Sequence, residues 1–247
     1  MNFDLTGKRA FITGSSRGIG SAIAVELARG GADVVIHCSA ISQKVEAVKN
    51  DILAFGRKCT VVVGDLRDTE SVKALANQVG NVDILVLNAS IQYKKKWESI
   101  TIEDFTQQMT CNCLASLLFI QAFVPMMKEN KWGRVITIGS VQEAKPHPDM
   151  LVYSASKCAQ TGLALSLASQ LASCGITVNN IAPGVIYTDR NKEALGDSAY
   201  AQKVRESIPV GFYGEKEDCA GIVRLLCSEA GRYITGQSIY VDGGKSL

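Results

Sequence analysis

Short runs of consecutive apolar residues recur along the chain, and longer segments with helical spacing separate them. A run of this length that is rich in Val and Ile is typical of a strand covered on both faces, as in a parallel sheet. Seven segments fit this pattern and are expected to be strands, namely residues 9–13, 33–38, 60–65, 83–88, 134–139, 176–182 and 238–242.

Apolar residues at intervals of four predict helices with one apolar face between these runs. Two such sets are Ile19, Ile23 and Leu27, and Leu163, Leu167 and Leu171. Gly30 with Gly31, and Gly175, follow them at positions where a left-handed residue commonly ends a helix.

This alternation of strand and helix predicts an α/β fold, a Rossmann-type doubly wound parallel sheet of about seven strands with helices on both faces. The sequence contains no Pro/Gly/Ser-rich linker, repeat or low-complexity block. We therefore expect residues 1–247 to form a single domain.

Composition narrows the class of protein. Hydrophobic residues make up 47% and charged residues 20% of the chain, which is typical of a compact globular protein. The formal net charge is +2 and the basic residues form no stripe, so neither a nucleic acid nor a membrane surface is expected as a partner. The first residues lack a signal-peptide pattern and no run approaches 18 uncharged apolar residues, which predicts a cytoplasmic protein.

The eight cysteines do not indicate a metal or disulfide framework. They contain no Cys-x-x-Cys pair and lie mostly within apolar segments, so reduced thiols in the core are expected. Only His37 and His147 could add imidazole ligands, and no metal centre is predicted.

The first expected strand leads directly into a glycine-rich turn, TGSSRGIG, at residues 13–20. At Gly14, Gly18 and Gly20 no side chain blocks the approach of a phosphate, and the helix that follows offers free N–H groups and its positive dipole end. A tight turn alone would also use glycine, but the strand before and the helix after favour a pyrophosphate site. Ser16, Arg17 and Ile19 complete the turn.

The end of the second expected strand bears on the choice of dinucleotide. Cys38 and Ser39 stand where an acidic residue would bind an unphosphorylated ribose. The guanidinium of Arg17 can pair with a 2′-phosphate, and no carboxylate nearby would repel that phosphate. These features favour NADP(H) over NAD(H). Lys44 is a further cation whose position the sequence does not fix.

Tyr153 and Lys157 are four residues apart and would share one helix face. A phenol with a pKa of about 10 is a poor base at neutral pH, and lowering this pKa by about 3 units requires about 4 kcal/mol. A cation about 4 Å away in an effective dielectric of about 20 supplies about that much. The pair could therefore deliver the proton that carbonyl reduction needs, although an isolated pair of this kind is more often found on the surface.

Several motifs occur together in a fixed order: TGSSRGIG, NAS at 88–90, Asn112, Ser140, YSASK at 153–157 and APGVIYT at 182–188. In this order and at these intervals the chain resembles the classical short-chain dehydrogenases/reductases. The likeness extends to ITGQSIYVDGG at 234–244, and its general style is that of the 3-oxoacyl-carrier-protein reductases. Two residues depart from the family pattern, since Leu87 and Ser90 replace the usual asparagine and glycine.

The resemblance implies a catalytic tetrad. Asn112 would anchor a water, Ser140 would hydrogen-bond the substrate oxygen and Tyr153 would transfer the proton. Lys157 would lower the pKa of the tyrosine and hold the nicotinamide ribose. The remaining cofactor contacts implied by the resemblance are Asp65 and Leu66 at the adenine, Asn88 and Ala89 at the ribose, and Pro183, Gly184, Ile186 and Thr188 around the nicotinamide.

The implied activity is a reversible hydride transfer between a nicotinamide and a carbonyl or secondary alcohol. A 3-oxoacyl thioester and a sugar or polyol are both open as substrates. Cys174 replaces an arginine that carrier-docking relatives use, whereas Gln142, Glu143 and His147 would bring polar groups to the substrate. Tyr187 is a further candidate, within a predicted lid at residues 187–209.

Two other expectations come from the same resemblance. A homotetramer, or a homodimer, would be built on the helices after the fourth and fifth strands and on the last strand. The main alternative to an enzyme is a catalytically silent dinucleotide-sensing or scaffold protein of the same fold, which predicts erosion of the tetrad. No such erosion is seen in the sequence.

Overall fold

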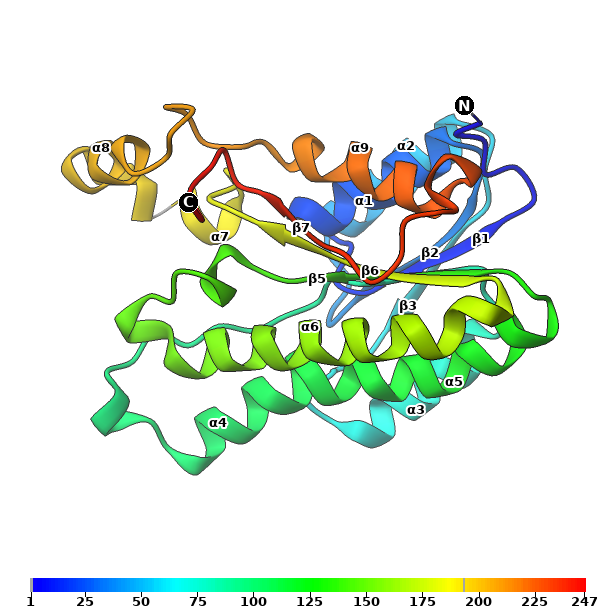
Figure 1. The fold of residues 1–247 in the computed structure, drawn as a ribbon, viewed down its shortest axis with the longest axis horizontal. Coiled ribbons are helices and arrows are strands. Elements are labelled where there is room, and N and C mark those ends of the chain that lie inside the picture. The colour runs from blue at the N-terminus through cyan, green and yellow to red at the C-terminus, as the bar shows by residue number, and fades with distance from the viewer. Residues whose placement is uncertain (1, 193) are drawn as a thin grey trace.

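The computed structural model describes residues 2–192 and 194–247. Its strands form one parallel sheet in the order β3-β2-β1-β4-β5-β6-β7 (Figure 1). The strands are β1 Arg9–Ile12, β2 Asp33–Cys38, β3 Cys59–Val63, β4 Ile84–Leu87, β5 Gly133–Ile138, β6 Ile176–Pro183 and β7 Ser238–Val241. All seven expected strands are present, and the predicted fold class is confirmed.

Helices cover both faces of the sheet, as Figure 1 shows. One face carries α1 Gly18–Arg29, α2 Gln43–Ala54 and α9 Lys216–Cys227, and the other carries α3 Thr69–Val79, α5 Ala115–Glu129 and α6 Leu151–Leu171. Successive strand residues point to opposite faces. Ala10 and Ile12 accordingly belong to one core and Phe11 to the other.

The buried face of α6 differs from the predicted one. Leu163 and Leu167 are only half-buried, while Ala164 and Ala168 are fully buried. Leu171 is buried as expected. Small side chains let the helix approach the sheet closely, so the alanines rather than the larger leucines occupy the contact. Lys157 and Tyr153 lie about two and three turns before Ala164 on this buried face.

The predicted helix ends are partly corrected. Gly175 is left-handed, with φ 75°, as expected. After α1 the left-handed residue is Gly31, with φ 104°, whereas Gly30 has a right-handed φ of −72°. The chain continues helically for one more residue than the glycine pair indicates.

A continuous helical run from Ile102 to Glu129 is long and apolar enough to cross a membrane by length and composition alone. The sequence expectation concerned an uninterrupted run of uncharged apolar residues, and polar residues such as Asn112 and Gln121 interrupt this helical run. The run comprises α4 Ile102–Met109, a π-helical turn at Thr110–Leu114 and α5. Phe119, Phe123 and Met127 are buried against the sheet. The apolar character of α5 is thus used in the protein core.

The segment after β6 contains short helices rather than an extended loop. They are α7 Asp189–Lys192, a 3₁₀ turn at Ala194–Gly196 and α8 Ser198–Glu206. Residue 193, within the predicted lid, lies outside the described residues. Further 3₁₀ turns are found at Trp97–Ser99, Val141–Glu143, Pro148–Met150, Ala172–Cys174 and Glu229–Gly231.

The turn between α6 and β6 depends on glycine, which yields a test of the fold. A Cβ atom at Gly175 would collide with the carbonyl oxygen of Lys131, at a residue whose φ is already positive. We expect Gly175→Ala to lower the free energy of unfolding by about 2–4 kcal/mol. Gly162→Ala is the matched control, because its Cβ would meet nothing within 4 Å inside α6.

The control should raise the free energy of unfolding by about 0.5–1 kcal/mol, since alanine is the better helix former. Urea denaturation of both variants measures these changes. Equal stability of Gly175→Ala and the parent protein would contradict this account of the turn.

Candidate active site

A cavity of about 790 Å³ opens at the carboxyl ends of the strands. In a doubly wound sheet this edge is where ligands bind. Every residue predicted to bind the cofactor lines the cavity. So do Ser140, Gln142 and His147. Asn112 is instead fully buried behind the wall, and Tyr187 is 44% exposed and does not line the cavity.

The glycine turn has the geometry that a phosphate cradle requires. Gly14 and Gly18 have φ values of 63° and 59°, which favour glycine, and a Cβ at Gly14 would lie 2.9 Å from the Cα of Ala89. No described side chain caps the N-terminus of α1, so its first N–H groups can bind an anion. These residues fit a dinucleotide pyrophosphate.

His37, which the sequence offered only as a weak metal ligand, supports this turn. Its Nδ1 accepts a hydrogen bond from the Gly14 N–H at 3.0 Å, so its Nε2 carries the proton and donates to the Gly64 carbonyl, also at 3.0 Å. Burial lowers the pKa of His37 and favours this neutral form. The imidazole therefore ties the glycine turn to the end of β3.

Asn88 connects the turn to β4. Its side-chain Nδ2 donates to the carbonyls of Thr13 and Gly14 at 2.9 and 3.0 Å, and its backbone N–H donates to the Thr13 hydroxyl. The side chain that the resemblance assigns to the cofactor's ribose side is thus also a brace between two strand ends.

Tyr153 and Lys157 lie side by side on the buried face of α6, with 6% and 1% of their surfaces exposed. The Lys157 Nζ is 5.9 Å from the centre of the Tyr153 ring. It donates to the Ile138 carbonyl at 2.7 Å and to Gln160 Oε1 at 3.0 Å. Among the described residues the Lys157 ammonium forms no hydrogen bond to the tyrosine hydroxyl. The sequence alone had predicted a separation of about 4 Å between these two groups.

Burial, and secondly the charge of Arg190, lower the pKa of Lys157 to about 7. The half-buried carboxyl of Glu143 acts in the opposite direction, but it makes no ion pair with the ammonium within the described residues. In the protein alone the charge of Lys157 is thus held mainly by neutral oxygen acceptors.

A buried chain of polar side chains links Lys157 to Asn112, and the sequence analysis missed two of its members. Gln160 accepts from Lys157 and donates through Nε2 to the Ser116 hydroxyl at 2.8 Å. Ser116 donates in turn to the Asn112 carbonyl at 3.3 Å. A single polar residue in an apolar helix has no periodic pattern that marks it in the sequence. Gln160 and Ser116 can therefore be recognised only from their contacts in the folded protein.

Asn112 sits in the π-helical turn between α4 and α5, a feature often found at functional sites. Its side-chain Oδ1 accepts from the Ile91 N–H at 2.8 Å, while Nδ2 donates to the Ile91 carbonyl and to the Ser156 hydroxyl, each at 2.9 Å. The asparagine therefore fixes the segment after β4 against α6.

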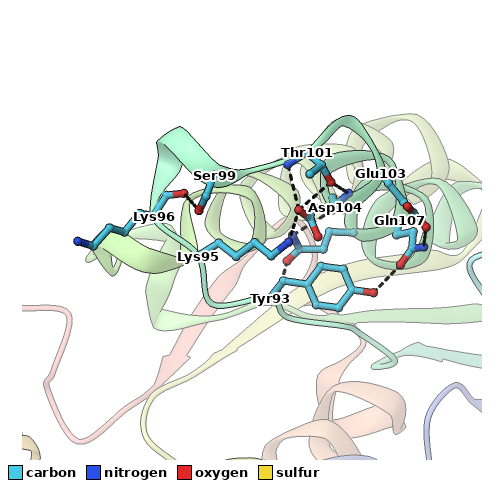
Figure 2. A network of polar contacts seen from close by, with 9 residues as sticks. Tyr93, Lys95, Lys96, Ser99, Thr101, Glu103, Asp104 and Gln107 are labelled. Atoms are coloured by element: carbon cyan, nitrogen blue, oxygen red, sulfur yellow. Dashed lines mark hydrogen bonds and ion pairs between the residues drawn. The ribbon is translucent and has the colours of Figure 1, made fainter.

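That segment is in turn anchored on α4, as Figure 2 shows. Tyr93 donates to Gln107 at 2.6 Å and Lys95 donates to Asp104 at 2.6 Å. The lysine, together with the capping hydrogen bonds of Thr101, lowers the pKa of the Asp104 carboxyl to about 2. The loop that carries Ile91 is therefore held at Asn88 on one side and at Tyr93 and Lys95 on the other.

Ser140 begins a short turn that shapes the cavity beyond Tyr153. Its Oγ accepts from the Gln142 N–H at 3.2 Å, which leaves the hydroxyl hydrogen for another acceptor. Gln142 holds the loop, since its Oε1 accepts from the His147 N–H and the Ser154 hydroxyl. The sequence predicted that the Glu143 carboxylate would point toward the substrate. Instead it folds back and accepts a hydrogen bond from the Ser140 N–H at 2.7 Å.

The beginning of the predicted lid lies across the cofactor side of the cavity. Arg190 donates to the Ser90 hydroxyl at 3.1 Å and to its carbonyl at 2.8 Å, and Asp189 accepts from Lys44. Ser90, one of the two departures from the family pattern, thus holds the lid to the end of β4.

The described residues give this site neither a low-pKa thiol at Cys111 nor a metal-binding cluster. Burial raises the pKa of Cys111, which lines the cavity, to about 11, so its thiol stays protonated at neutral pH. Within residues 2–192 and 194–247 the cysteines are free thiols, and no group of three metal-ligating side chains comes together.

Comparison with known proteins agrees with this geometry. Residues 14–246 match the family model described as enoyl-(acyl carrier protein) reductase. The 3-oxoacyl-[acyl-carrier-protein] reductase FabG of Rickettsia bellii is 38% identical over 241 residues, which covers 98% of each chain.

Two solved structures share the fold over almost the whole chain. A 3-oxoacyl (acyl-carrier-protein) reductase from Agrobacterium tumefaciens C58 with NADP bound has a TM-score of 0.93 and 35% identity, covering 98% of this chain and 96% of that one. A Beutenbergia cavernae protein, provisionally assigned as an NAD(P)-dependent gluconate 5-dehydrogenase with NADP at low occupancy, has a TM-score of 0.94 and 33% identity over 99% of each chain. The chain belongs to the short-chain dehydrogenase/reductase family of NAD(P)-dependent oxidoreductases.

Proposed function

We propose that this protein transfers a hydride reversibly between NADP(H) and a carbonyl or secondary alcohol, with Tyr153 as the proton donor and acceptor. The observation that carries the proposal is that Ser140, Tyr153 and Lys157 line one cavity with the glycine turn. Nicotinamide supplies or accepts the hydride when it is bound. The tetrad positions support an enzyme over a silent sensor, because all four are intact.

In the reducing direction the Ser140 hydroxyl donates a hydrogen bond to the carbonyl oxygen. The Tyr153 hydroxyl donates a second hydrogen bond to this oxygen and gives up its proton as the oxygen becomes an alcohol. Neither hydroxyl donates a hydrogen bond to another protein atom among the described residues, and the Ser140 Oγ only accepts. The two donors are therefore free to meet a substrate oxygen.

Lys157 would stabilise the tyrosinate that remains after proton transfer. Its ammonium is held by one carbonyl and one amide oxygen in the protein alone, and the ribose hydroxyls of the dinucleotide offer further acceptors. Additional hydrogen bonds to the charged form raise the pKa of a lysine. Cofactor binding would thus protonate Lys157 at neutral pH, which is the form that catalysis requires. Asn112 would hold the water of the proton relay next to Lys157.

NADP(H) is favoured over NAD(H) by the adenine side of the cavity. A second hollow of about 450 Å³ is lined by the cations Arg17 and Lys44 and by neutral residues including Ser39, and no carboxylate lines it within the described chain. Arg17 forms no ion pair with any described residue. A 2′-phosphate would find a cation and hydroxyl donors there.

The substrate remains one of two classes, a 3-oxoacyl thioester or a hydroxylated sugar-type compound. The names of the relatives support both, and the family model names a third reaction, enoyl reduction. A panel of acetoacetyl and crotonyl thioesters and keto-sugars, followed by NADPH consumption, separates them. Turnover with none of them would remove support for both substrate classes.

We also propose a cytoplasmic homotetramer, with a homodimer as the alternative, formed by one domain whose residues 187–209 act as a lid. The helices after β4 and β5 expose Phe105 and Leu165, and β7 exposes Tyr240, as a covered surface would require. Size-exclusion chromatography with light scattering distinguishes these assemblies from a monomer.

Replacing Tyr153 tests the chemistry. We expect Tyr153→Phe to lower kcat by about 1,000-fold, because the proton donor is lost, and to change the Kd for NADPH by less than about 3-fold. Stopped-flow turnover and fluorescence titration measure the two quantities. Tyr233→Phe, at a fully exposed tyrosine, is the control and should match the parent protein. Retained turnover in Tyr153→Phe would refute the assignment.

Replacing Arg17 tests the cofactor preference. Arg17→Ala should weaken NADPH binding by about 10-fold and leave NADH within about 2-fold, since only NADPH carries the 2′-phosphate. Ser39→Asp should shift preference toward NADH through repulsion of that phosphate. Equal losses for both dinucleotides in Arg17→Ala would show that the guanidinium does not read the phosphate.

The protonation of Lys157 has a consequence for stability. The unfolded chain keeps this lysine protonated up to its ordinary pKa of 10.5, whereas the folded protein loses the proton near 7. Between these values the unfolded state binds more protons, so folding stability rises with pH. Below about pH 7 both states hold the proton, so this contribution no longer changes with pH.

We expect the free energy of unfolding of the cofactor-free protein to rise by about 2 kcal/mol from pH 7 to pH 9, relative to Lys157→Met. Urea titrations of both proteins at each pH measure this difference. Parallel pH profiles for the two would show that the buried lysine titrates normally.

A further inference from the structure

Three lysines from different parts of the chain line one end of the cavity. Lys145 follows β5, Lys203 belongs to α8, and Lys245 follows β7. In the sheet order β5, β6 and β7 lie together at the side away from β2 and β3. The lysines are therefore at the substrate end of the cavity, whereas the glycine turn and Arg17 serve the opposite end. Figure 1 shows the C-terminus near α7 and toward α8.

Hydrogen bonds bring these segments together. Lys245 donates to the Ser207 hydroxyl just after α8 at 2.6 Å, and Lys145 donates to the carbonyl of Leu247. Ser207 and both lysines line the same cavity. The loop after Ser140, the lid and the C-terminal tail therefore meet around one space.

Within the described residues no Asp or Glu side chain forms an ion pair with these lysines, although Lys145 contacts an oxygen of the last residue, Leu247. The two acidic residues that line the cavity are already paired, Asp65 with Arg67 and Asp189 with Lys44. Asp242 is near Lys245, but its oxygens accept from the Gly244 and Ser246 N–H groups.

Two of the lysines also repel one another. Partial burial, followed by the charge of Lys145, lowers the pKa of Lys245, and Asp242 offsets this only in part. Lys145 and Lys203 are exposed and Lys245 is half-buried. Like charges held close together oppose folding, and such an arrangement is characteristic of a site that binds an opposite charge.

We propose that the substrate carries an anionic group, away from its reacting carbon, which Lys145, Lys203 and Lys245 bind. This inference rests on the proposed function and narrows its substrate class. Two sources provide such a group. One is the carboxylate of a small hydroxy acid, and the other is the phosphate on the pantetheine arm of an acyl thioester.

The neighbouring polar groups suit either source. His147, Gln142 and Tyr200 line the cavity beside the lysines and offer hydrogen bonds to hydroxyl or amide groups. A neutral polyol or an uncharged thioester would leave the lysines without a partner. Binding should therefore depend on the charge of the substrate more than on its length.

Binding measurements on Tyr153→Phe with saturating NADP⁺ test this without turnover. Two matched pairs of probes are titrated by calorimetry, gluconate against glucitol and acetoacetyl-pantetheine 4′-phosphate against acetoacetyl-pantetheine. We expect the anionic member of one pair to bind at least about 10-fold more tightly than its neutral partner. The pair that shows this preference identifies the source of the charge. Higher ionic strength should weaken only the anionic probe.

Lysine variants in the same background connect the preference to these residues. Lys145→Gln, Lys203→Gln and Lys245→Gln should each weaken the anionic probe by about 5-fold, and the triple variant should remove the preference. Lys128→Gln, at an exposed lysine of α5 away from the cavity, should have no effect. Lys245→Arg should retain most of the affinity, and unchanged NADP⁺ binding shows that each variant is folded.

Equal binding within both pairs, or an anion preference that survives in the triple variant, would overturn the inference. Failure of the proposed function would appear differently. It would show as turnover by Tyr153→Phe itself, whatever the lysine variants bind.

Discussion

The arrangement of this site depends on a buried lysine, Lys157, that has no carboxylate partner among residues 2–192 and 194–247. Moving an ammonium from water into the protein interior is costly unless hydrogen-bond acceptors surround it. Here Ile138 and Gln160 provide two oxygens for Lys157. Because they do not cancel its charge, the lysine loses its proton near neutral pH and remains responsive to any ligand that adds acceptors. A carboxylate in place of Gln160 would hold the proton permanently and remove that response.

The surrounding structure keeps this lysine in place. Small alanines on α6 allow the helix to approach β5 and β6, which brings Lys157 within reach of the carbonyl at the end of β5. Ser116 orients Gln160, and the π-helical turn places Asn112 between Ile91 and Ser156. On the other side of the cavity His37 and Asn88 brace the glycine turn. The cavity therefore has two parts built from different helices. The glycine turn before α1 suits phosphates, and the Tyr153 and Lys157 side chains of α6 suit proton transfer.

Sequence predicted the parts of this protein that have a periodic or positional signal. The seven strands were identified because continuous Val and Ile runs distinguish them, and the glycine turn because a strand and a helix flank it. The Tyr153 and Lys157 pair could be expected to share a helix face from spacing alone. The family followed from the joint order of these motifs and is confirmed by full-length relatives.

Other features could not be predicted, for identifiable reasons. The leucines of α6 indicated the wrong buried face, because close packing selected alanines over larger side chains. Gln160, Ser116 and His37 are single polar residues in apolar segments, and only tertiary contacts reveal their partners. Glu143 turned back toward the Ser140 backbone, since the tight turn after β5 brings the two together. Charges from three distant segments converge at the substrate end only once the sheet order is known.

The central claim is that burial makes Lys157 titrate near neutral pH in the free protein and that a bound dinucleotide raises this value. An NMR titration with ¹³C-labelled lysine, assigned with Lys157→Met, measures it at the residue itself. The account predicts a midpoint near 7 without cofactor and a higher midpoint with NADP⁺ bound. A midpoint at the ordinary lysine value of about 10.5 in the free protein would contradict it.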